Sequence, residues 1–277
     1  MNISVIIPVH EFNEVVAGYL DKAIESVLKQ ENLVELPEVI VVAPLGLQGL
    51  IECCVKYNDD TFVPGRAPKV RIINHEGKTD YQSQVNLAVE SVTTDYFSVL
   101  EFDDEYSTTY LRNASKYTQS YPEIDVFLTM MIEVNEKNEG LKLTNETVWA
   151  QQFVGENGEM GYLNANALKQ YTDFKLSGAV IKKSEFKNLG GYKSNIKLTF
   201  MYEFLLRALN NASKVFSIPR IGYKHLATRE DSLFGQYQKN MPVDERKFWF
   251  DTANKEANFT NDRIIDLSRL QHKIVVE

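Results

Sequence analysis

In the first hundred residues, segments that predict strands alternate with segments that predict helices, and this alternation restricts the possible folds more than any other feature. The predicted strands are apolar runs rich in β-branched residues, at 3–9, 39–42, 70–74 and 96–100. The segment that begins at Leu20 spaces its apolar residues as a helix packed on a sheet does. Repeated strand-to-helix units favour right-handed crossovers, so we predict an α/β fold with a Rossmann-like, mostly parallel sheet flanked by helices.

The pattern changes after Tyr106, where the chain predicts a smaller mixed region and then helices only. The expected elements are a helix at 108–121, strands at 125–134, 141–143 and 175–182, a Gly-Gly turn at 188–192, a helix at 201–209, a strand at 212–223, and helices at 244–257 and 261–273.

The net charge and the short apolar runs argue against a general nucleic-acid binder and a membrane-spanning protein, and leave a local basic groove open. The formal net charge of −8 lacks the basic footprint of general nucleic-acid binding, so we expect no such binding. No apolar run approaches the ~20 residues that a membrane span needs, so no transmembrane segment is expected. The N-terminus enters a predicted strand without the features of a secretory leader, and the adjacent Cys53 and Cys54 lie in an apolar helical pattern. We therefore expect a cytoplasmic protein with reduced cysteines.

The predicted strand at 96–100 ends in a group of acids. Glu101, Asp103, Asp104 and Glu105 follow its apolar residues at once. Ligands of an open parallel sheet bind at the carboxyl ends of the strands, so these side chains would face a bound molecule. Side chains two apart on a strand point the same way, which puts Glu101 and Asp103 on one face, where a divalent cation would relieve their mutual repulsion. A solvated acidic loop is the alternative.

Four blocks of sequence resemble, in this order, motifs of the family 2 glycosyltransferases, which have the GT-A fold. Each block is weak alone, and their order and spacing over roughly residues 1–235 carry the resemblance. The blocks are Ile3-Ser-Val-Ile-Ile-Pro-Val-His10 with the helix at 20–30, Ser83–Ala88 with the acidic segment Asp95–Glu105, Ser177–Lys183 with Leu189-Gly-Gly-Tyr192, and Ile218–His225 with Ser232-Leu233.

The resemblance implies that different parts of the chain bind the donor and the acceptor. Residues 1–107 would form a nucleotide-sugar-binding half and 108–235 an acceptor-binding half of one GT-A domain, with 236–277 as a C-terminal helical extension. The implied activity is a metal-dependent, inverting transfer by a hexosyltransferase, from a nucleoside-diphosphate sugar to a hydroxyl of a glycan or other acceptor. The C-terminal helices would pack on the main body or form a homodimer contact.

The resemblance also implies a metal site. Glu101 and Asp103 would hold Mn²⁺ or Mg²⁺ on the diphosphate, with Asp104 as a substitute. The motif is Glu-x-Asp here, where the family usually has Asp at both ends. His225 would be a further metal or phosphate ligand, and the alternative for it is a partly buried, hydrogen-bonded histidine.

Donor-binding residues follow from the same blocks. Pro8, Val9 and His10 would line the base and ribose, and Asn86 lies in the block that precedes the acidic strand. Lys78 would contact a phosphate, unless it is a solvated loop residue.

Three positions depart from the family pattern. Ala43-Pro44 stand where an Asp normally contacts the nucleobase, and Val85 stands where an Arg is usual. Phe200-Met201 replace the acid pair that provides the catalytic base of an inverting enzyme. The general nucleotide site is therefore expected, but the usual base contact and proton acceptor are not.

Two other carboxylates are candidate bases. Glu203 is the nearest acid on the predicted helix at 201–209, and its alternative is a surface glutamate. Asp231 lies in a predicted loop that could fold over the acceptor.

The missing base motivates a rival hypothesis, a catalytically degenerate GT-A-like protein that binds a nucleotide or glycan. A nucleotidyltransferase would carry a Gly-rich, basic loop after its first strand, and residues 10–14 offer none. A glycoside hydrolase would hold its two carboxylates ~5 to 9 Å apart across the sugar, not two residues apart on one strand.

Overall fold

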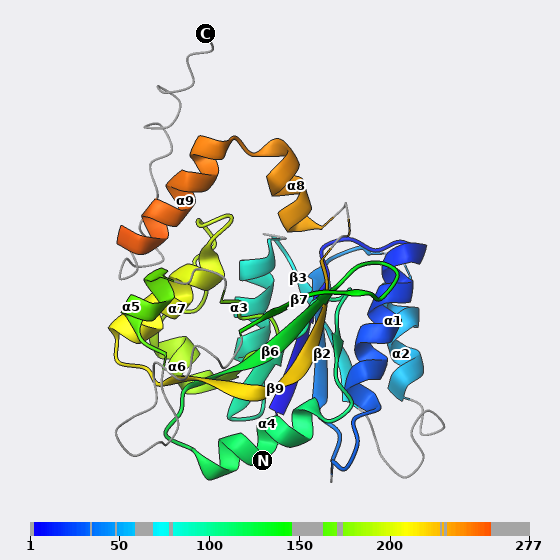
Figure 1. Ribbon diagram of the computed structural model, residues 1–277. Helices are drawn as coiled ribbons and strands as arrows, with labels where there is room; N and C mark the ends of the chain where they lie inside the picture. Colours follow the sequence, from blue (N-terminus) through cyan, green and yellow to red (C-terminus); the bar gives the residue numbers. More distant parts are fainter. Residues whose placement is uncertain are drawn as a thin grey trace.

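The computed structural model describes residues 3–33, 35–47, 49–58, 69–77, 80–145, 163–170, 174–227, 229 and 232–255 (Figure 1). The predicted loop at 59–68 and the predicted helix at 261–273 lie outside these residues, as do Lys78 and Asp231.

The first half of the chain forms a parallel part of the sheet. Its strands are β1 (Ile3–Pro8), β2 (Glu38–Pro44), β3 (Lys69–His75) and β4 (Tyr96–Val99). They lie in the order β3-β2-β1-β4, and each neighbouring pair is parallel. The connecting helices are α1 (Glu14–Leu28), α2 (Leu50–Val55, continued by a 3-10 turn) and α3 (Tyr81–Ser91). The predicted alternation and its parallel sheet are confirmed.

Both faces of this sheet are buried, which explains why its strands are apolar throughout. Along β1, Val5 and Ile7 belong to the apolar cluster that includes α1. Ile6 points the other way, into the cluster that includes α3. Alternate side chains of a strand point to opposite faces, so the sheet has helices on both sides.

Side-chain caps determine where the first helices begin. The Asn13 side chain accepts a hydrogen bond from the Val16 amide at 2.9 Å, so α1 starts at Glu14 rather than near Leu20. The Asp80 side chain accepts from the Ser83 amide at 2.9 Å and starts α3 in the same way. Both caps satisfy amides of the first helical turn.

The second half extends the sheet with a mixed set of strands. They are β5 (Glu105–Tyr106), β6 (Val126–Val134), β7 (Gly140–Thr144), β8 (Val180–Lys182) and β9 (Val215–Leu226). Beyond β4 the order is β8-β6-β9-β5, with β7 paired to β6 as the predicted hairpin. The predicted strand at 175–182 is shorter than expected, because residues before β8 form a turn at Ser177 and Gly178.

Helices of the second half cover this extension. They are α4 (Tyr110–Ser120), α5 (Ala165–Gln170), α6 (Lys183–Asn188), α7 (Phe200–Asn210), α8 (Leu233–Asn240) and α9 (Val243–Lys255). Sequence patterns did not predict α5, α6 and α8. In Figure 1, α8 and α9 lie together at the top of the view.

The helix α9 is part of the main body. Trp249 is fully buried in the apolar cluster that contains α7, and its backbone carbonyl accepts a hydrogen bond from Thr199 at 2.9 Å.

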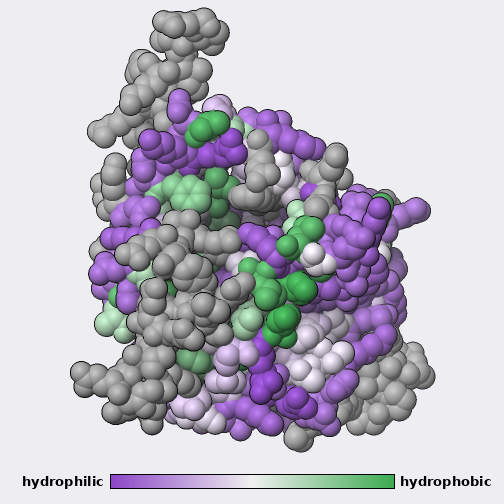
Figure 2. Space-filling view, in the orientation of Figure 1, coloured by the Kyte–Doolittle hydropathy of each residue, from purple (hydrophilic) through white to green (hydrophobic). Residues whose placement is uncertain are grey.

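Among the described residues, no helix is both long and apolar enough to cross a membrane. Figure 2 shows a mostly hydrophilic face with an apolar patch, and Leu141, Leu143 and Ile221 are exposed on β7 and β9.

Candidate functional site

The acids that follow β4 lie in a turn, not on an extended strand. The strand ends at Val99, and the Asp104 amide donates to the Glu101 carbonyl at 3.0 Å. The prediction that Glu101 and Asp103 share a strand face is therefore wrong. The turn brings Glu101 and Asp104 together instead, at the carboxyl end of β4.

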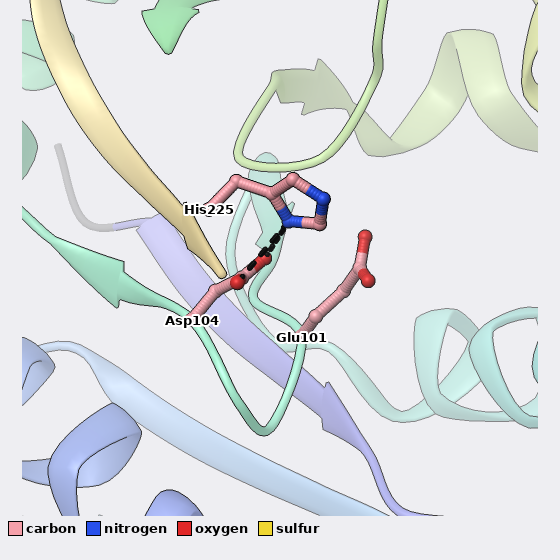
Figure 3. Close-up of side chains that lie close together, drawn as sticks. All are labelled: Glu101, Asp104 and His225. Atoms are coloured by element: carbon pink, nitrogen blue, oxygen red, sulfur yellow. Dashed lines mark hydrogen bonds and ion pairs between the residues drawn. The ribbon is translucent and has the colours of Figure 1, made fainter. Parts of the chain in front are cut away.

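A histidine from β9 completes a cluster with these two acids. Residues 105–106 form β5, which pairs antiparallel with β9 and places Glu105 opposite Lys224. The residues on either side, Asp104 and His225, therefore meet across the strand pair. Ligand atoms of Glu101, Asp104 and His225 all lie within 4.8 Å of one another (Figure 3).

Hydrogen bonds hold this cluster in place. The buried Asp104 carboxylate interacts with His225 Nδ1 at 2.9 Å and accepts from the Leu226 amide at 2.8 Å. The Glu101 amide donates to the Tyr223 hydroxyl at 3.1 Å. Three residues of β9, Tyr223, His225 and Leu226, thus hold the two acids in place.

Charges within the cluster shift its protonation equilibria. Burial, followed by the nearby Asp104 carboxylate, raises the pKa of Glu101. Burial alone would lower the pKa of His225, but the charge and hydrogen bond of Asp104 outweigh it and raise the pKa to about 9. A positive charge is therefore stabilised at this point, because two carboxylates converge there.

The residues present fit a divalent cation. Two carboxylates and one imidazole form an oxygen and nitrogen donor set that Mn²⁺ accepts. Asp104 also fixes the orientation of the His225 ring, as partners of metal-binding histidines commonly do. The pair predicted to hold the metal, Glu101 and Asp103, does not converge. Asp104, the predicted substitute, lies with Glu101 and His225 in a geometry that suits a metal ion.

Asp103 lies apart from this cluster and faces Arg229. The Arg229 Nε is 3.0 Å from an Asp103 carboxylate oxygen, although its N–H is not directed at that oxygen. The guanidinium stacks over Phe102, 4.9 Å from the ring centroid. Burial, followed by Asp104 and Glu101, raises the pKa of Asp103 to about 7. No sequence pattern indicated this role for Arg229.

A glycine turn brings a hydroxyl to the cluster. Ser177 donates a short hydrogen bond to the Glu101 carboxylate. Gly178 has a φ of +72°, which suits glycine, and its amide donates to the Val99 carbonyl at 2.9 Å. This bond ties the turn to the end of β4, so Ser177 faces the acid that follows the strand.

Glu203 is neither a surface residue nor open to a substrate. Its side chain is 0% exposed, and its two oxygens accept from Arg207 Nε at 2.8 Å and from a second guanidinium nitrogen at 2.9 Å. Burial raises its pKa, while Arg207 opposes that shift. The expectation of a surface glutamate is wrong, and this sequestered ion pair argues against a catalytic base.

The predicted donor-lining residues differ in their surroundings. Pro8 and Val9 are buried at the carboxyl end of β1, where the Val9 amide donates to the Val42 carbonyl at 2.8 Å. The His10 side chain is 41% exposed and its ring lies 5.4 Å from that of Phe102. His10 therefore offers an accessible aromatic surface beside the acidic turn.

Asn86 has a structural role that sequence analysis did not predict. Its side-chain amide donates to the Tyr192 carbonyl at 2.7 Å and accepts from the Tyr192 amide at 2.9 Å. Asn86 thus ties α3 to the Gly190-Gly191 turn rather than pointing an open amide at a donor. Arg207 donates to the Gly191 carbonyl of the same turn at 2.8 Å.

A surface hollow elsewhere does not belong to this site. It has a volume of about 430 Å³ and is lined by residues that include Asp95, Tyr96 and Lys183. Because Tyr96 begins β4, the hollow lies at the opposite end of the strand from the acid cluster.

Comparisons with known proteins agree with this architecture. The sequence model of the family described as "Glycosyl transferase family 2" matches residues 4–174. A search of curated proteins finds no significant match.

Solved structures of S. aureus TarS are similar to this chain. One TarS crystal structure has a TM-score of 0.61 and 17% identity; the alignment covers 94% of this chain and 44% of that chain. TarS 1–349 in complex with UDP has a TM-score of 0.62 and 14% identity, covering 93% and 81% of the two chains. The complex of TarS 1–349 with UDP-GlcNAc has a TM-score of 0.62 and 15% identity, covering 94% and 82%. This chain thus spans less than half of the first TarS chain, and the likeness confirms the predicted GT-A type α/β fold.

Proposed function

This chain belongs to glycosyl transferase family 2, and from that premise we propose that it transfers a sugar from a nucleoside-diphosphate sugar to an acceptor hydroxyl. The observation that carries the proposal is the convergence of Glu101, Asp104 and His225 at the carboxyl end of β4. Ligands of open α/β sheets bind at this end of the strands. The complexes of TarS with UDP and UDP-GlcNAc support a nucleotide-sugar donor.

We expect Glu101, Asp104 and His225 to hold Mn²⁺ or Mg²⁺. The bound ion would neutralise charge on the diphosphate of the donor. The protein's own contribution is to bring the two carboxylates together and to hold the His225 ring through Asp104. Asp103 would position the Arg229 side chain rather than bind the ion, because the two side chains lie at ion-pair distance.

The two halves of the domain would divide substrate binding. Residues 1–107 would bind the donor, with Pro8, Val9 and His10 beside its nucleoside. Residues 108–235 would bind a glycan or other hydroxyl-bearing acceptor. The cytoplasmic location and the role of Lys78 stay predictions from the sequence.

An inverting mechanism needs a carboxylate that accepts the proton of the acceptor hydroxyl. The helix α7 begins at Phe200, and Glu203 within it is held by Arg207. We therefore favour Asp231, which lies outside the described residues, over Glu203 as the proton acceptor. An inverting hexosyltransferase is the form of the reaction that we propose.

The lack of a free carboxylate at the start of α7 favours one alternative function. In this alternative the chain binds a nucleotide or glycan through the same cluster and catalyses no transfer. A binding protein of this kind would still require the metal-binding residues, so binding alone does not separate the two functions.

Release of nucleoside diphosphate from sugar donors tests the proposal. The purified chain is incubated with UDP-sugars or GDP-mannose and Mn²⁺, and free UDP or GDP is measured. We expect Asp104→Asn to reduce the release rate by about 100-fold or more, because it removes a cluster carboxylate. Glu90→Gln is the control, since the Glu90 side chain is 59% exposed and pairs with Lys187 away from the cluster.

Two results would contradict the proposal in different ways. Equal release rates for wild type and Asp104→Asn would mean that the cluster is not the donor site. Tight UDP binding by the wild type, without release of nucleoside diphosphate from any donor, would support the binding protein.

A further inference from the structure

Lys175 is held rigidly beside the acid cluster by contacts to its backbone and its side chain. The Asn145 side chain accepts from the Lys175 amide at 2.9 Å and donates to the Lys175 carbonyl at 2.8 Å. Asn145 also donates to the Thr129 carbonyl at 3.0 Å, which anchors it on β6. The Lys175 ammonium donates to the Glu133 carboxylate at 2.6 Å.

Glu133 is suited to position this ammonium group. Its side chain is 8% exposed and also accepts from Thr144 at 3.0 Å. Burial alone would raise the pKa of Glu133, but the hydrogen bond and charge of Lys175 outweigh it and lower the pKa. Lys142 lies 3.5 Å from the same carboxylate. The Lys175 and Lys142 ammonium groups therefore both lie at this one carboxylate.

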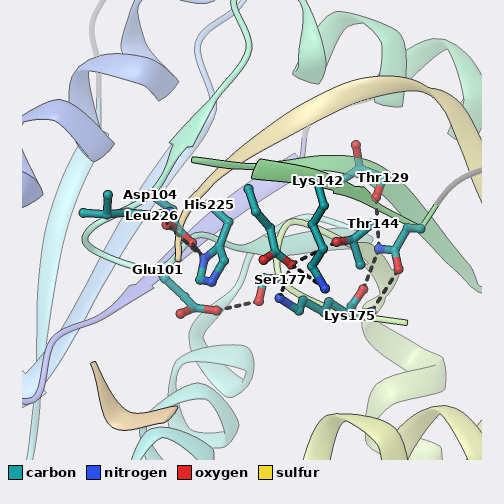
Figure 4. Close-up of polar contacts among 11 residues, drawn as sticks. Glu101, Asp104, Thr129, Lys142, Thr144, Lys175, Ser177, His225 and Leu226 are labelled. Atoms are coloured by element: carbon teal, nitrogen blue, oxygen red, sulfur yellow. Dashed lines mark hydrogen bonds and ion pairs between the residues drawn. The ribbon is translucent and has the colours of Figure 1, made fainter. Parts of the chain in front are cut away.

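The Lys175 ammonium group adjoins the proposed donor site. Glu133 on β6 lies beside His225 on β9 in the strand register. Figure 4 shows the Lys175 side chain directed toward Ser177, which in turn bonds Glu101. The Lys175 side chain is 31% exposed, so it is partly accessible to solvent.

We propose that Lys175 binds the phosphoryl oxygens of a nucleoside diphosphate and that Glu133 is its positioning residue. This inference rests on the proposed function and adds a protein cation to the cluster that would hold a metal ion. An ammonium group is a compact charge that pairs with phosphate oxygens, and the fixed backbone removes part of the entropy of ordering it. In a protein with a formal net charge of −8, a local cation is needed where an anion binds.

Binding measurements with Lys175→Met test this assignment. Isothermal titration with UDP, with inorganic pyrophosphate and with uridine, each in the presence of Mn²⁺, separates phosphate contacts from contacts to the nucleoside. We expect about ten-fold weaker binding of UDP and pyrophosphate and unchanged binding of uridine. The dependence of UDP affinity on salt should also become shallower, since one charge contact is lost.

Three further variants separate a ligand contact from a structural ion pair. Lys175→Arg keeps the positive charge and should restore most of the UDP affinity. Glu133→Gln should weaken UDP binding less than Lys175→Met, because the ammonium remains but loses its orienting charge. Lys187→Met is the control, because Lys187 has the same 2.6 Å pairing distance, to Glu90, at the other end of the sheet. It should leave all three affinities unchanged.

The outcomes distinguish this inference from the proposed function. Unchanged UDP and pyrophosphate affinities in folded Lys175→Met would overturn the assignment of Lys175 alone. An equal loss of uridine binding would assign Lys175 to general folding of the site and would also overturn it. A wild-type chain that binds neither pyrophosphate nor a nucleoside diphosphate, UDP and GDP included, would contradict both proposals.

Discussion

At the level of single residues, the partner of a buried carboxylate determines what that carboxylate can do. Glu101 and Asp104 face each other, and the positive charge at their meeting point comes from His225. Glu203 instead has both oxygens engaged by Arg207, within the same helix. The Glu101–Asp104 arrangement suits the binding of a cation, or of an anion that a cation bridges to the carboxylates. The Glu203–Arg207 pair suits the anchoring of a turn.

The Glu203–Arg207 pair provides a test at this scale. Replacing Arg207 by Met leaves the Glu203 carboxylate buried without its partner and also frees carbonyls of the turn at 189–191. We expect the free energy of unfolding to fall by about 3–5 kcal/mol, because an uncompensated charge in the interior is costly. Urea denaturation, followed by circular dichroism, measures this change.

A double variant and an isosteric variant complete the test. Glu203→Leu with Arg207→Met removes both charges and should recover much of the lost stability. Glu203→Gln should leave donor hydrolysis nearly unchanged. A fall of 100-fold or more in that rate, with folding intact, would instead identify Glu203 as the base.

Some of these residue roles could be predicted from the sequence. An apolar strand followed at once by acids is typical of a binding edge, so the place of Glu101 and Asp104 was foreseeable. Their relative arrangement was not, because it depends on a turn bond between the Asp104 amide and the Glu101 carbonyl. The Asp103–Arg229 contact joins residues 126 positions apart in the chain, with no pattern that connects them.

At the level of elements, the site is assembled by short connections. The strand β5 has only two residues, yet its pairing with β9 brings Asp104 to His225. The turn at Gly178 brings Ser177 to Glu101. Long amphipathic helices and apolar strands were predictable from periodicity, whereas a two-residue strand and a glycine turn have too little pattern to detect.

Gly178 provides the prediction at this scale. Its φ of +72° is unfavourable for other residues, and an added Cβ would collide with the buried Tyr223 ring. We expect Gly178→Ala to lower the free energy of unfolding by about 2–4 kcal/mol, since neither the backbone nor the ring has room to shift. Thermal and urea denaturation check this value.

Gly18 is the matched control for Gly178. It lies in α1, and an added Cβ would have nothing within 4 Å. Gly18→Ala should stabilise the chain by about 0.5–1 kcal/mol, because alanine favours the helix. Equal effects of the two substitutions would contradict the assigned role of the Gly178 turn.

At the level of the whole molecule, the two clusters of buried apolar residues divide the protein into layers. One cluster lies between the sheet and α1, and the other lies between the sheet, α3 and α7. The second cluster also contains Trp249 of α9. The described part of the predicted C-terminal extension therefore shares a core with the rest of the domain, which the polar composition of that segment did not reveal.

The role of α9 leads to the prediction at this scale. Trp249 is 0% exposed, whereas the adjacent Phe250 is 38% exposed and lies 5.9 Å from the Tyr202 ring. We expect Trp249→Ala to lower the free energy of unfolding by about 3–5 kcal/mol through loss of buried area and the cavity that remains. Phe250→Ala should cost less than about 1.5 kcal/mol, because its side chain is partly in water already.

Light scattering coupled to size-exclusion chromatography measures the molar mass of both variants. Together with their stability, the molar mass separates packing of α9 in the core from association of two chains. If α9 serves mainly as a homodimer contact, Phe250→Ala should lower the molar mass and Trp249→Ala should leave the stability of the monomer intact. If α9 is part of the core, Trp249→Ala should destabilise the chain at every protein concentration. Stability that rises with protein concentration in the wild type and not in Phe250→Ala would favour the dimer, since association stabilises a folded state by mass action. The burial of Trp249 in the same apolar cluster as α7 favours the core, and with it a domain in which α9 packs on the second half of the chain.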